Sequence, residues 1–352
     1  MSLDWLGPAR QATPAVEPSQ CWDYGAPVTG IAFSRPSGHL AVALGDGTLR
    51  IVTRRGAPAE TTVVAVHDGA ALTLRQDLLP DSFLSGGDDG RIVHCRSDGS
   101  GRTLLHEPGK FIDTIAVAGT MRAVAMGREV RLLDNAGNQI GRTEDHPSTV
   151  SGLAFNPKGK RLAVSHYGGV TLWWTAAMGR TPRRYNWRGS HIGVSWSPDG
   201  KYLMTATQER ELHGWRLADG SNIRMGGYAA KIRSFDWIAK PPYFVTTGAD
   251  SVTAWSFSGR GPEGRAPFEF GQRPGILVSC VASHPKRPLV AFGYEDGETR
   301  IAEIPGEREV RFRQSGGGRV TSIAWSADGT TIAAGTSWGS VSLTELDRAT
   351  LW

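Results

Sequence analysis

The sequence has few cysteines, no long apolar run and no leader-like beginning. No stretch of about 18 apolar residues occurs, so we expect no membrane-spanning helix and no membrane partner. The opening residues Met1–Trp5 lack the basic and apolar regions of a secretory signal, and we therefore expect a cytoplasmic protein. Cys21, Cys95 and Cys280 are far apart and odd in number, which argues against disulfides and against a structural zinc site. We expect no metal and no cofactor.

Several motifs that carry catalysis are also missing. There is no phosphate-binding Gly-x-x-x-x-Gly-Lys-Ser/Thr segment and no His-Glu-x-x-His zinc motif. Acidic residues such as Asp46, Asp88 and Asp296 come one or two at a time beside glycines, which is typical of tight hairpins. Glycoside hydrolysis, by contrast, needs two carboxylates about 5–10 Å apart around one bond. We therefore predict that the protein is not an enzyme.

The charge balance shows no strong excess of one sign. The 39 basic residues are offset by 34 acidic ones, which leaves a formal net charge of +5. Nucleic-acid binding needs clustered cations. The densest basic stretch, around Tyr185 and Trp187, contains Arg180, Arg183, Arg184 and Arg188. A nucleic-acid-associated factor that uses these arginines stays an alternative, but we do not expect nucleic acid as the main partner.

Glycine, in contrast, is abundant, and it accompanies an internal repeat. The chain has 45 glycines in 352 residues, about 13% against a usual share of about 7%. An alternating apolar run, a turn with Pro, Asp or Gly, and a second apolar run recur, which is typical of a β-hairpin. The clearest copies occupy residues 31–42, 153–164, 194–205 and 323–334.

The repeats have a regular period. Eight first strands are expected to start at Val28, Ala71, Asp113, Val150, Ile192, Ile232, Val278 and Val320. Their mean spacing of about 42 residues lies within the period of four-stranded propeller blades. Eight starts predict eight blades.

These hairpins resemble the repeats of the WD40 β-propeller family, and the resemblance covers nearly the whole chain. A family repeat reads Gly-His, a strand ending in Phe/Trp-Ser-Pro-Asp-Gly, a second strand, a turn with Asp, and a third strand ending in Trp-Asp. Residues Trp196–Gly200 match the first strand ending letter for letter, whereas no repeat retains the final Trp-Asp pair. The resemblance implies an all-β fold, a single propeller of eight four-stranded blades. Seven blades are the alternative if the short segment 111–134 proves irregular.

The resemblance also implies how the ring closes. In this family each repeat supplies the outer strand of one blade and the three inner strands of the next. Residues of about 17–23 are therefore expected to form the outer strand of the last blade. We expect residues 1–14 to be a flexible arm and residues 15–350 to be a single β-propeller domain.

Histidines recur at similar repeat positions, which a metal site could also explain. Zinc needs its ligands about 2.0–2.1 Å from one point, whereas equivalent positions of successive blades lie far apart. In the family this histidine hydrogen-bonds to an aspartate of the second turn, which for His67 implies Asp88 or Asp89. Tryptophans of the third strands are expected to pack between blades. The residues with implied structural roles are His67, Asp88, His146, Trp174, His191, Trp215, Asp250 and Trp255.

The remaining candidates are surface residues. Loops that precede first strands, and turns that join second to third strands, are expected at one end of the ring. Aromatic and arginine side chains there suit a protein interface. The candidate partner-binding residues are Tyr24, Lys110, Phe111, Tyr167, Arg210, Tyr228, Lys231, Tyr294, Arg319 and Trp338.

We therefore predict a non-catalytic scaffold that binds a protein or peptide on this ring face, as a monomeric propeller within a larger assembly. One alternative is a small-molecule or metal-binding propeller, or an enzyme, that uses the central channel. The other is the nucleic-acid-associated factor.

Overall fold

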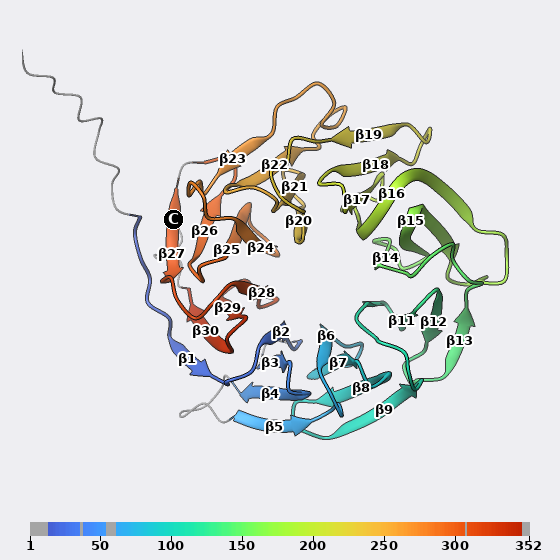
Figure 1. The fold of residues 1–352 in the computed structure, drawn as a ribbon, viewed down its shortest axis with the longest axis horizontal. Coiled ribbons are helices and arrows are strands. Elements are labelled where there is room, and N and C mark those ends of the chain that lie inside the picture. Colours follow the sequence, from blue (N-terminus) through green and yellow to red (C-terminus); the bar gives the residue numbers. More distant parts are fainter. Residues whose placement is uncertain (1–12, 36–37, 54–60, 307, 347–352) are drawn as a thin grey trace, which may run out of the picture.

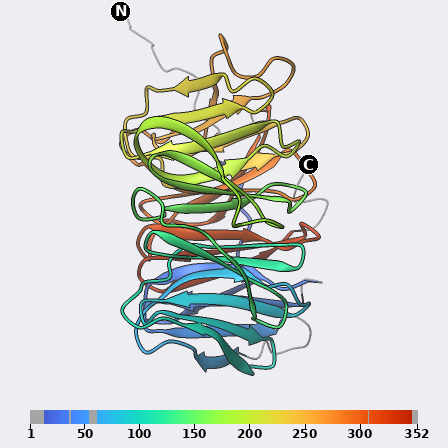
Figure 2. The ribbon, with the colours of Figure 1, turned by 90° about the vertical axis from the view of Figure 1, so that its right-hand side faces the viewer.

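The structure, a computed structural model, describes residues 13–35, 38–53, 61–306 and 308–346. Strands are the regular elements of these residues, and they contain no helix long and apolar enough to cross a membrane. The sheets are arranged around a central axis in chain order (Figure 1). Seen edge-on, the strands run between the two faces of the ring (Figure 2).

The first three sheets have four antiparallel strands each. Their strands are β2 (Val28–Phe33), β3 (His39–Leu44), β4 (Thr48–Thr53) and β5 (Thr61–Ala65); β6 (Ala71–Gln76), β7 (Ser82–Gly87), β8 (Arg91–Arg96) and β9 (Gly101–His106); and β10 (Ile115–Ala118), β11 (Met121–Met126), β12 (Glu129–Leu133) and β13 (Gln139–Arg142).

A larger sheet follows, with six strands. It comprises β14 (Gly152–Phe155), β15 (Arg161–Trp174), β16 (Arg183–Trp196), β17 (Tyr202–Thr207), β18 (Leu212–Arg216) and β19 (Asn222–Met225).

The last three sheets again have four strands each. They comprise β20 (Phe235–Ile238), β21 (Tyr243–Thr246), β22 (Val252–Ser256) and β23 (Phe268–Phe270); β24 (Val278–Ser283), β25 (Leu289–Tyr294), β26 (Thr299–Glu303) and β27 (Glu309–Arg313); and β28 (Val320–Trp325), β29 (Thr331–Thr336) and β30 (Ser340–Glu345) with β1 (Gln20–Asp23).

Burial explains the sequence pattern of the strands. The second strands β7, β17, β25 and β29 are buried along their whole length, because both faces of each strand pack against neighbouring sheets. This position selects near-continuous apolar and small residues. Outer strands such as β9 and β13 are mostly exposed, so their sequences are more polar.

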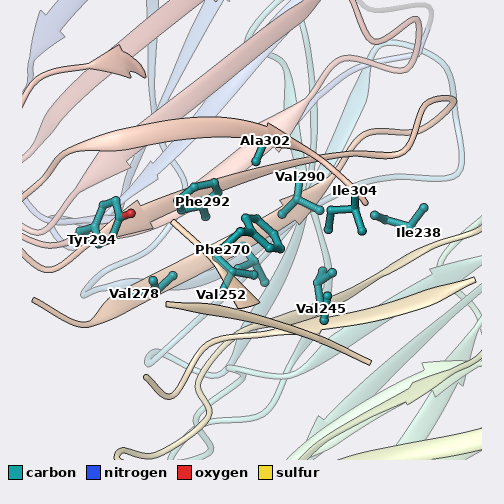
Figure 3. Packing of buried hydrophobic residues seen from close by; sticks show 12 residues of the cluster. Ile238, Val245, Val252, Phe270, Val278, Val290, Phe292, Tyr294, Ala302 and Ile304 are labelled. Carbon is teal, nitrogen blue, oxygen red and sulfur yellow. The ribbon is translucent and has the colours of Figure 1, made fainter. Parts of the chain in front are cut away.

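The hydrophobic core is a series of layers between adjacent sheets. In one layer Val245 and Phe270 of one sheet pack against Val290 and Phe292 of the next (Figure 3). The rings of Phe270 and Phe292 meet edge to face, with centroids 5.5 Å apart and an interplanar angle of 82°. Edge-to-face contact is a favoured geometry for aromatic pairs.

The closure of the ring by the N-terminal strand is confirmed. Strand β1 pairs antiparallel with β30, from Gln20 opposite Leu343 to Asp23 opposite Ser340. The first and last sheets are also joined directly, because Thr321 Oγ1 donates to the carbonyl oxygen of Val28 at 2.7 Å. The last sheet therefore combines residues from both ends of the chain.

If a blade is defined as one hydrogen-bonded sheet, the prediction of eight blades is wrong. The described residues form seven sheets, because Gly152–Met225 is a single six-stranded sheet that contains two predicted repeat starts, Val150 and Ile192. The segment 111–134, the expected cause of a seven-blade count, belongs to the regular sheet β10–β13.

Two strands of 14 residues produce the merged sheet. Strand β15 includes the turn expected at Tyr167, because Gly168 and Gly169 have positive φ and Arg161 at its start lies over the ring of Trp174 at its end. Strand β16 includes His191, where one blade is expected to end and the next to begin. The first part of β16 pairs with β15 and its second part with β17, so one strand serves two repeats. The pairing register shifts at both places, between Tyr167 and Gly169 in β15 and between His191 and Gly193 in β16.

The domain boundaries stay predictions. Most of the expected arm, residues 1–14, and the boundary at residue 350 lie outside the described residues. The carbonyl oxygen of Pro14 accepts a hydrogen bond from the backbone N–H of Arg311 at 2.8 Å, and Val16 donates to the Arg311 carbonyl at 2.8 Å. The described chain thus begins alongside β27.

Candidate functional site

His67 lies in a buried hydrogen-bond network of the second sheet. Its Nδ1 is 3.0 Å from Asp89 Oδ1 and its Nε2 is 2.8 Å from Ser85 Oγ. Of the two aspartates that the resemblance implies, the structure places Asp89 against the ring. Asp88 instead lies over Gly69, where a Cβ would be 2.2 Å from its carboxylate. Burial lowers the pKa of His67 more than Asp89 raises it, so the network joins a neutral imidazole to a carboxylate.

His146 forms an equivalent network with Trp173, not with Trp174. The indole Nε1 of Trp173 donates to His146 Nε2 at 3.0 Å, and His146 Nδ1 bonds to the Arg128 carbonyl at 2.7 Å. Trp173 is 3% exposed, whereas Trp174 is 49% exposed. The predicted packing role of Trp174 is therefore wrong, because adjacent strand residues point to opposite sides and the inward position is Trp173.

The next repeat carries His191 and Trp215 in the predicted structural positions. His191 Nδ1 is 2.8 Å from Thr205 Oγ1, its Nε2 is 3.0 Å from the Trp187 carbonyl, and Trp215 is 2% exposed. His213 stacks on Trp187, with centroids 3.9 Å apart. The ring of Trp187, one of the two aromatic side chains of the basic stretch, is therefore engaged in packing.

Tyr228 replaces the histidine in the sheet β20–β23. Trp255 Nε1 donates to the Tyr228 hydroxyl at 2.7 Å, and that hydroxyl is 2.8 Å from Thr246 Oγ1. Burial raises the pKa of Tyr228 to about 12. Tyr228 is therefore half-buried, with its hydroxyl engaged in hydrogen bonds inside the sheet. Asp250, in the turn before β22, is half-buried, and its backbone carbonyl accepts from Arg273.

Tyr294 is removed from the surface set. Its side chain is fully buried, its hydroxyl donates to the Gly271 carbonyl, and Arg273 and Arg300 lie over its ring at 4.8 and 5.5 Å. Burial raises the pKa of Tyr294 far above its usual range. The Tyr294 side chain therefore stabilises the end of β25 and is not accessible to a partner.

The other predicted surface residues lie at one end of the ring, which we call the start face because first strands begin there. Phe111 precedes β10, Tyr167 lies beside the pairing of Ser165 with Gly152 at the start of β14, and Trp338 lies between β29 and β30. These three aromatic side chains are 68%, 57% and 70% exposed. Lys110 and Arg210 are exposed, and Tyr24, Lys231 and Arg319 are half-buried.

A cavity of about 330 Å³ opens beside Lys110 on this face. Its wall carries both signs of charge: Arg131 pairs with Glu107 at 2.9 Å and with Glu129 at 2.6 Å. The lining residues are Glu107, Lys110, Met126, Gly127, Arg128, Glu129, Arg131, Arg142 and Asp145. Exposed Phe111 next to this polar hollow combines an apolar anchor with a charged rim, the usual anatomy of a protein interface.

Trp338 belongs to Gly335–Gly339, whose letters match the Gly-x-Ser-x-Gly pattern of hydrolase nucleophiles. That pattern requires a strand followed by a helix. Here the segment joins two strands, β29 and β30, and the Ser337 backbone N–H bonds to the Arg319 carbonyl at 2.8 Å. The segment is a hairpin turn and carries no argument for a nucleophile.

Sequence reasoning missed a buried ion network around Asp77. Arg122 Nε and Nη2 donate to the two carboxylate oxygens of Asp77 at 2.6 and 2.9 Å, and His94 Nδ1 is 2.5 Å from the same carboxylate. Burial works to raise the pKa of Asp77, but the bonds to His94 and Arg122 outweigh it and lower the pKa to about 2. His94 in the place of the family's tryptophan is the signal that could have found this network.

The closed ring of antiparallel sheets defines the class of the protein as a β-propeller. The family described as "WD domain, G-beta repeat" matches residues 137–174, and the "Anaphase-promoting complex subunit 4 WD40 domain" matches residues 281–352. The resemblance to the WD40-repeat β-propeller family is thereby confirmed.

Curated relatives agree with this assignment. WD repeat-containing protein slp1 of Schizosaccharomyces pombe is 25% identical over 36% of this chain and 27% of its own length. Transcription initiation factor TFIID subunit 5 of Caenorhabditis elegans is 25% identical over 38% and 20%, and apoptotic protease-activating factor 1 of Rattus norvegicus is 25% identical over 59% and 16%. The similarity thus covers 27% or less of the length of each of these relatives.

A solved structure supports the fold. The crystal structure of the computationally designed Ika8 protein superimposes with a TM-score of 0.76 at 15% identity, covering 95% of this chain and all of that one. Among the described residues, no group of three or more His, Cys, Asp and Glu side chains is placed to hold a metal ion.

Proposed function

We propose that the protein is a non-catalytic scaffold that binds a protein or peptide on the start face. The observation that carries the proposal is the exposure of Phe111, Tyr167 and Trp338 at that one end of the ring. Large exposed aromatic side chains are the residue type that interface hot spots favour. One matching family and one similar protein bear names of components of assemblies, the anaphase-promoting complex and TFIID, which supports a role in protein complexes.

The central experiment is affinity purification of the tagged protein from its source, followed by mass spectrometry. The start-face variant carries Phe111→Ala, Tyr167→Ala and Trp338→Ala. The matched control carries Val63→Ala and Ile140→Ala, which remove side chains that are 55% and 52% exposed on the outer strands β5 and β13. We expect a stoichiometric partner that the control variant retains and the start-face variant loses.

Two results would overturn the proposal. One is recovery of no stoichiometric partner under mild conditions. The other is equal recovery of the partner by the start-face variant and by the wild type. Both variants change exposed side chains, so their melting temperatures should match that of the wild type and exclude misfolding as the cause.

The nucleic-acid alternative has one supporting feature, the exposed Arg180, Arg183, Arg184 and Arg188. The aromatic residues between these arginines are not free to stack on bases, because Tyr185 is 5% exposed and Trp187 stacks on His213. A steep salt dependence of RNA or DNA retention would favour this alternative. The cytoplasmic location stays a prediction.

A further inference from the structure

A cavity of about 420 Å³ lies on the other face of the ring, which we call the far face. The turns that join first to second strands lie there, because they are at the strand ends opposite the start face. Two of these turns and the end of β15 form the cavity. Its lining residues are Asn156, Pro157, Lys158, Lys160, Arg161, Trp174, Pro198, Asp199 and Gly200.

Trp174 is the apolar anchor of this cavity. Its ring is 49% exposed, although the neighbouring Trp173 is 3% exposed, and Arg161 lies over one ring face at 4.6 Å. A second hollow of about 200 Å³ is lined by Leu172, Trp173 and Arg183 and shares Arg161 and Trp174 with the first. Trp174 and the two prolines therefore offer apolar walls to a side chain from outside.

The rim of the two hollows is cationic. Lys158, Lys160, Arg161 and Arg183 contribute four positive charges, and within the described part of the chain none of them forms an ion pair. The one carboxylate of the lining, Asp199, is held by Lys201 Nζ at 3.1 Å and by Ser197 Oγ at 2.7 Å. An arriving carboxylate therefore meets four cations and one carboxylate, Asp199, that is already paired with Lys201.

The cavity is built in advance by hydrogen bonds from side chains to backbone carbonyls. Thr175 Oγ1 donates to the Gly159 carbonyl at 3.1 Å, which ties the end of β15 to the first turn. Trp196 Nε1 donates to the Ala154 carbonyl at 3.0 Å, which ties β16 to β14. Binding to a preformed site costs less ordering of the protein.

We propose that this far-face cavity binds an acidic peptide segment of a protein partner. An apolar or aromatic side chain of the segment packs against Trp174 and the prolines, and flanking carboxylates pair with Lys158, Lys160 and Arg161. The site deepens the proposed scaffold function and rests on it, because it gives the scaffold a second binding surface. Nucleic acid fits less well, since Arg161 already covers one face of Trp174 and leaves less of the ring for a base to stack on.

The test measures fluorescence anisotropy of a labelled peptide in which glutamates flank one phenylalanine. The same peptide with glutamine in place of glutamate, and a short labelled oligothymidine, are the comparison probes. The variants are Lys158→Gln with Lys160→Gln, and Trp174→Ala. Lys286→Gln is the matched control, because Lys286 is exposed on the far face in the turn between β24 and β25.

We expect the glutamate peptide to bind the wild type and Lys286→Gln equally, and to bind each cavity variant about tenfold or more weakly. Trp174→Phe should retain most of the affinity. Absence of binding, equal binding of the glutamine peptide, or cavity-dependent binding of oligothymidine in place of the peptide would each overturn the proposal.

The two proposals fail separately. The start-face variant with Phe111, Tyr167 and Trp338 replaced should bind the glutamate peptide as the wild type does. If the start-face variant loses the purified partner but still binds the peptide, the result bears on the start-face proposal alone. Loss of peptide binding in Trp174→Ala with the partner retained concerns the far-face cavity alone.

Discussion

One buried ion pair, Asp77 with Arg122, contributes strongly to the stability of the fold. Asp77 and Arg122 are 0% and 1% exposed and connect the sheets β6–β9 and β10–β13. Removing one partner of a buried ion pair leaves an uncompensated charge in a medium that solvates it poorly. The pair should therefore matter far more than the surface pairs around it.

We predict that Arg122→Met lowers the free energy of unfolding by about 3–5 kcal/mol. Urea denaturation measures the change. Arg96→Ala, which removes an exposed pair with Asp98 at 3.7 Å, should change stability by about 0.5 kcal/mol or less. Equal effects of the two substitutions would contradict a stabilising role for the buried pair.

The buried histidines predict a pH dependence of stability. Burial lowers the pKa of His146 and of His213 to about 4, so both are neutral in the folded protein. Histidine in an unfolded chain has a pKa of about 6.5. The unfolded state therefore takes up these protons first, and stability present above pH 6.5 is lost as the pH falls toward 4, at up to about 1.4 kcal/mol per pH unit for each histidine.

Urea midpoints measured from pH 7.5 to pH 5 test this dependence. His146→Gln should flatten the fall in stability, whereas His106→Gln should leave it unchanged, because His106 is exposed. A wild-type stability that is constant over this range would contradict the assignment of neutral buried histidines.

At the same scale, sequence reasoning identified His67 but gave the structural role to Asp88, whereas Asp89 is the partner. It also misplaced Trp174 and did not foresee the inward bonds of Tyr228. The choice between Trp173 and Trp174 depends on strand register, and a shift of one residue exchanges the buried and exposed sides. Tyr228 could not be assigned from sequence, because a tyrosine at that position can bond inward to Thr246 or face a partner.

At the scale of elements, β1 is the strand on which closure depends. Its four residues pair with β30 and cover an edge that would otherwise be open. We predict that deletion of residues 1–25 lowers the melting temperature and the cooperativity of unfolding. Deletion of residues 1–12, which retains β1, is the control and should leave both close to the wild-type values. An unchanged melting temperature of the longer deletion, measured by calorimetry, would contradict the role of β1.

Gly335 in β29 tests the packing between the last and first sheets. A Cβ at this position would lie 2.6 Å from Val28 Cγ1 and 2.9 Å from Ile31 Cδ1. Gly335→Ala should therefore destabilise the protein by about 1–3 kcal/mol through overpacking. Gly179→Ala, where no atom lies within 4 Å of the new Cβ, should be close to neutral. Equal losses of unfolding free energy for the two variants, measured by chemical denaturation, would contradict this close packing between the last and first sheets.

The period of the sequence located the strands but not the number of sheets. All eight predicted starts lie in or just before a strand, yet β15 and β16 join two repeats in one sheet. Whether backbone pairing continues at Tyr167 and His191 depends on local geometry: Gly168 and Gly169 carry a turn signal, yet Tyr167 still pairs with Ser190 of β16. Repeat spacing alone therefore could not give the sheet count.

At the scale of the whole molecule, the ring offers two faces with different chemistry. The start face presents Phe111, Tyr167 and Trp338, and the far face presents Trp174 among unpaired cations. The ring architecture could be predicted because spacing reports it. The far-face cavity could not, because it depends on which of two adjacent tryptophans turns outward.

The most direct test of the start-face assignment is crosslinking of the purified complex with a lysine-reactive reagent. The seven lysines of the chain are divided between the faces: Lys110 and Lys231 lie on the start face, and Lys158, Lys160, Lys201, Lys240 and Lys286 lie on the far face. We predict that crosslinks to the stoichiometric partner include Lys110 and Lys231. A partner that crosslinks only to Lys201, Lys240 or Lys286 would contradict the account.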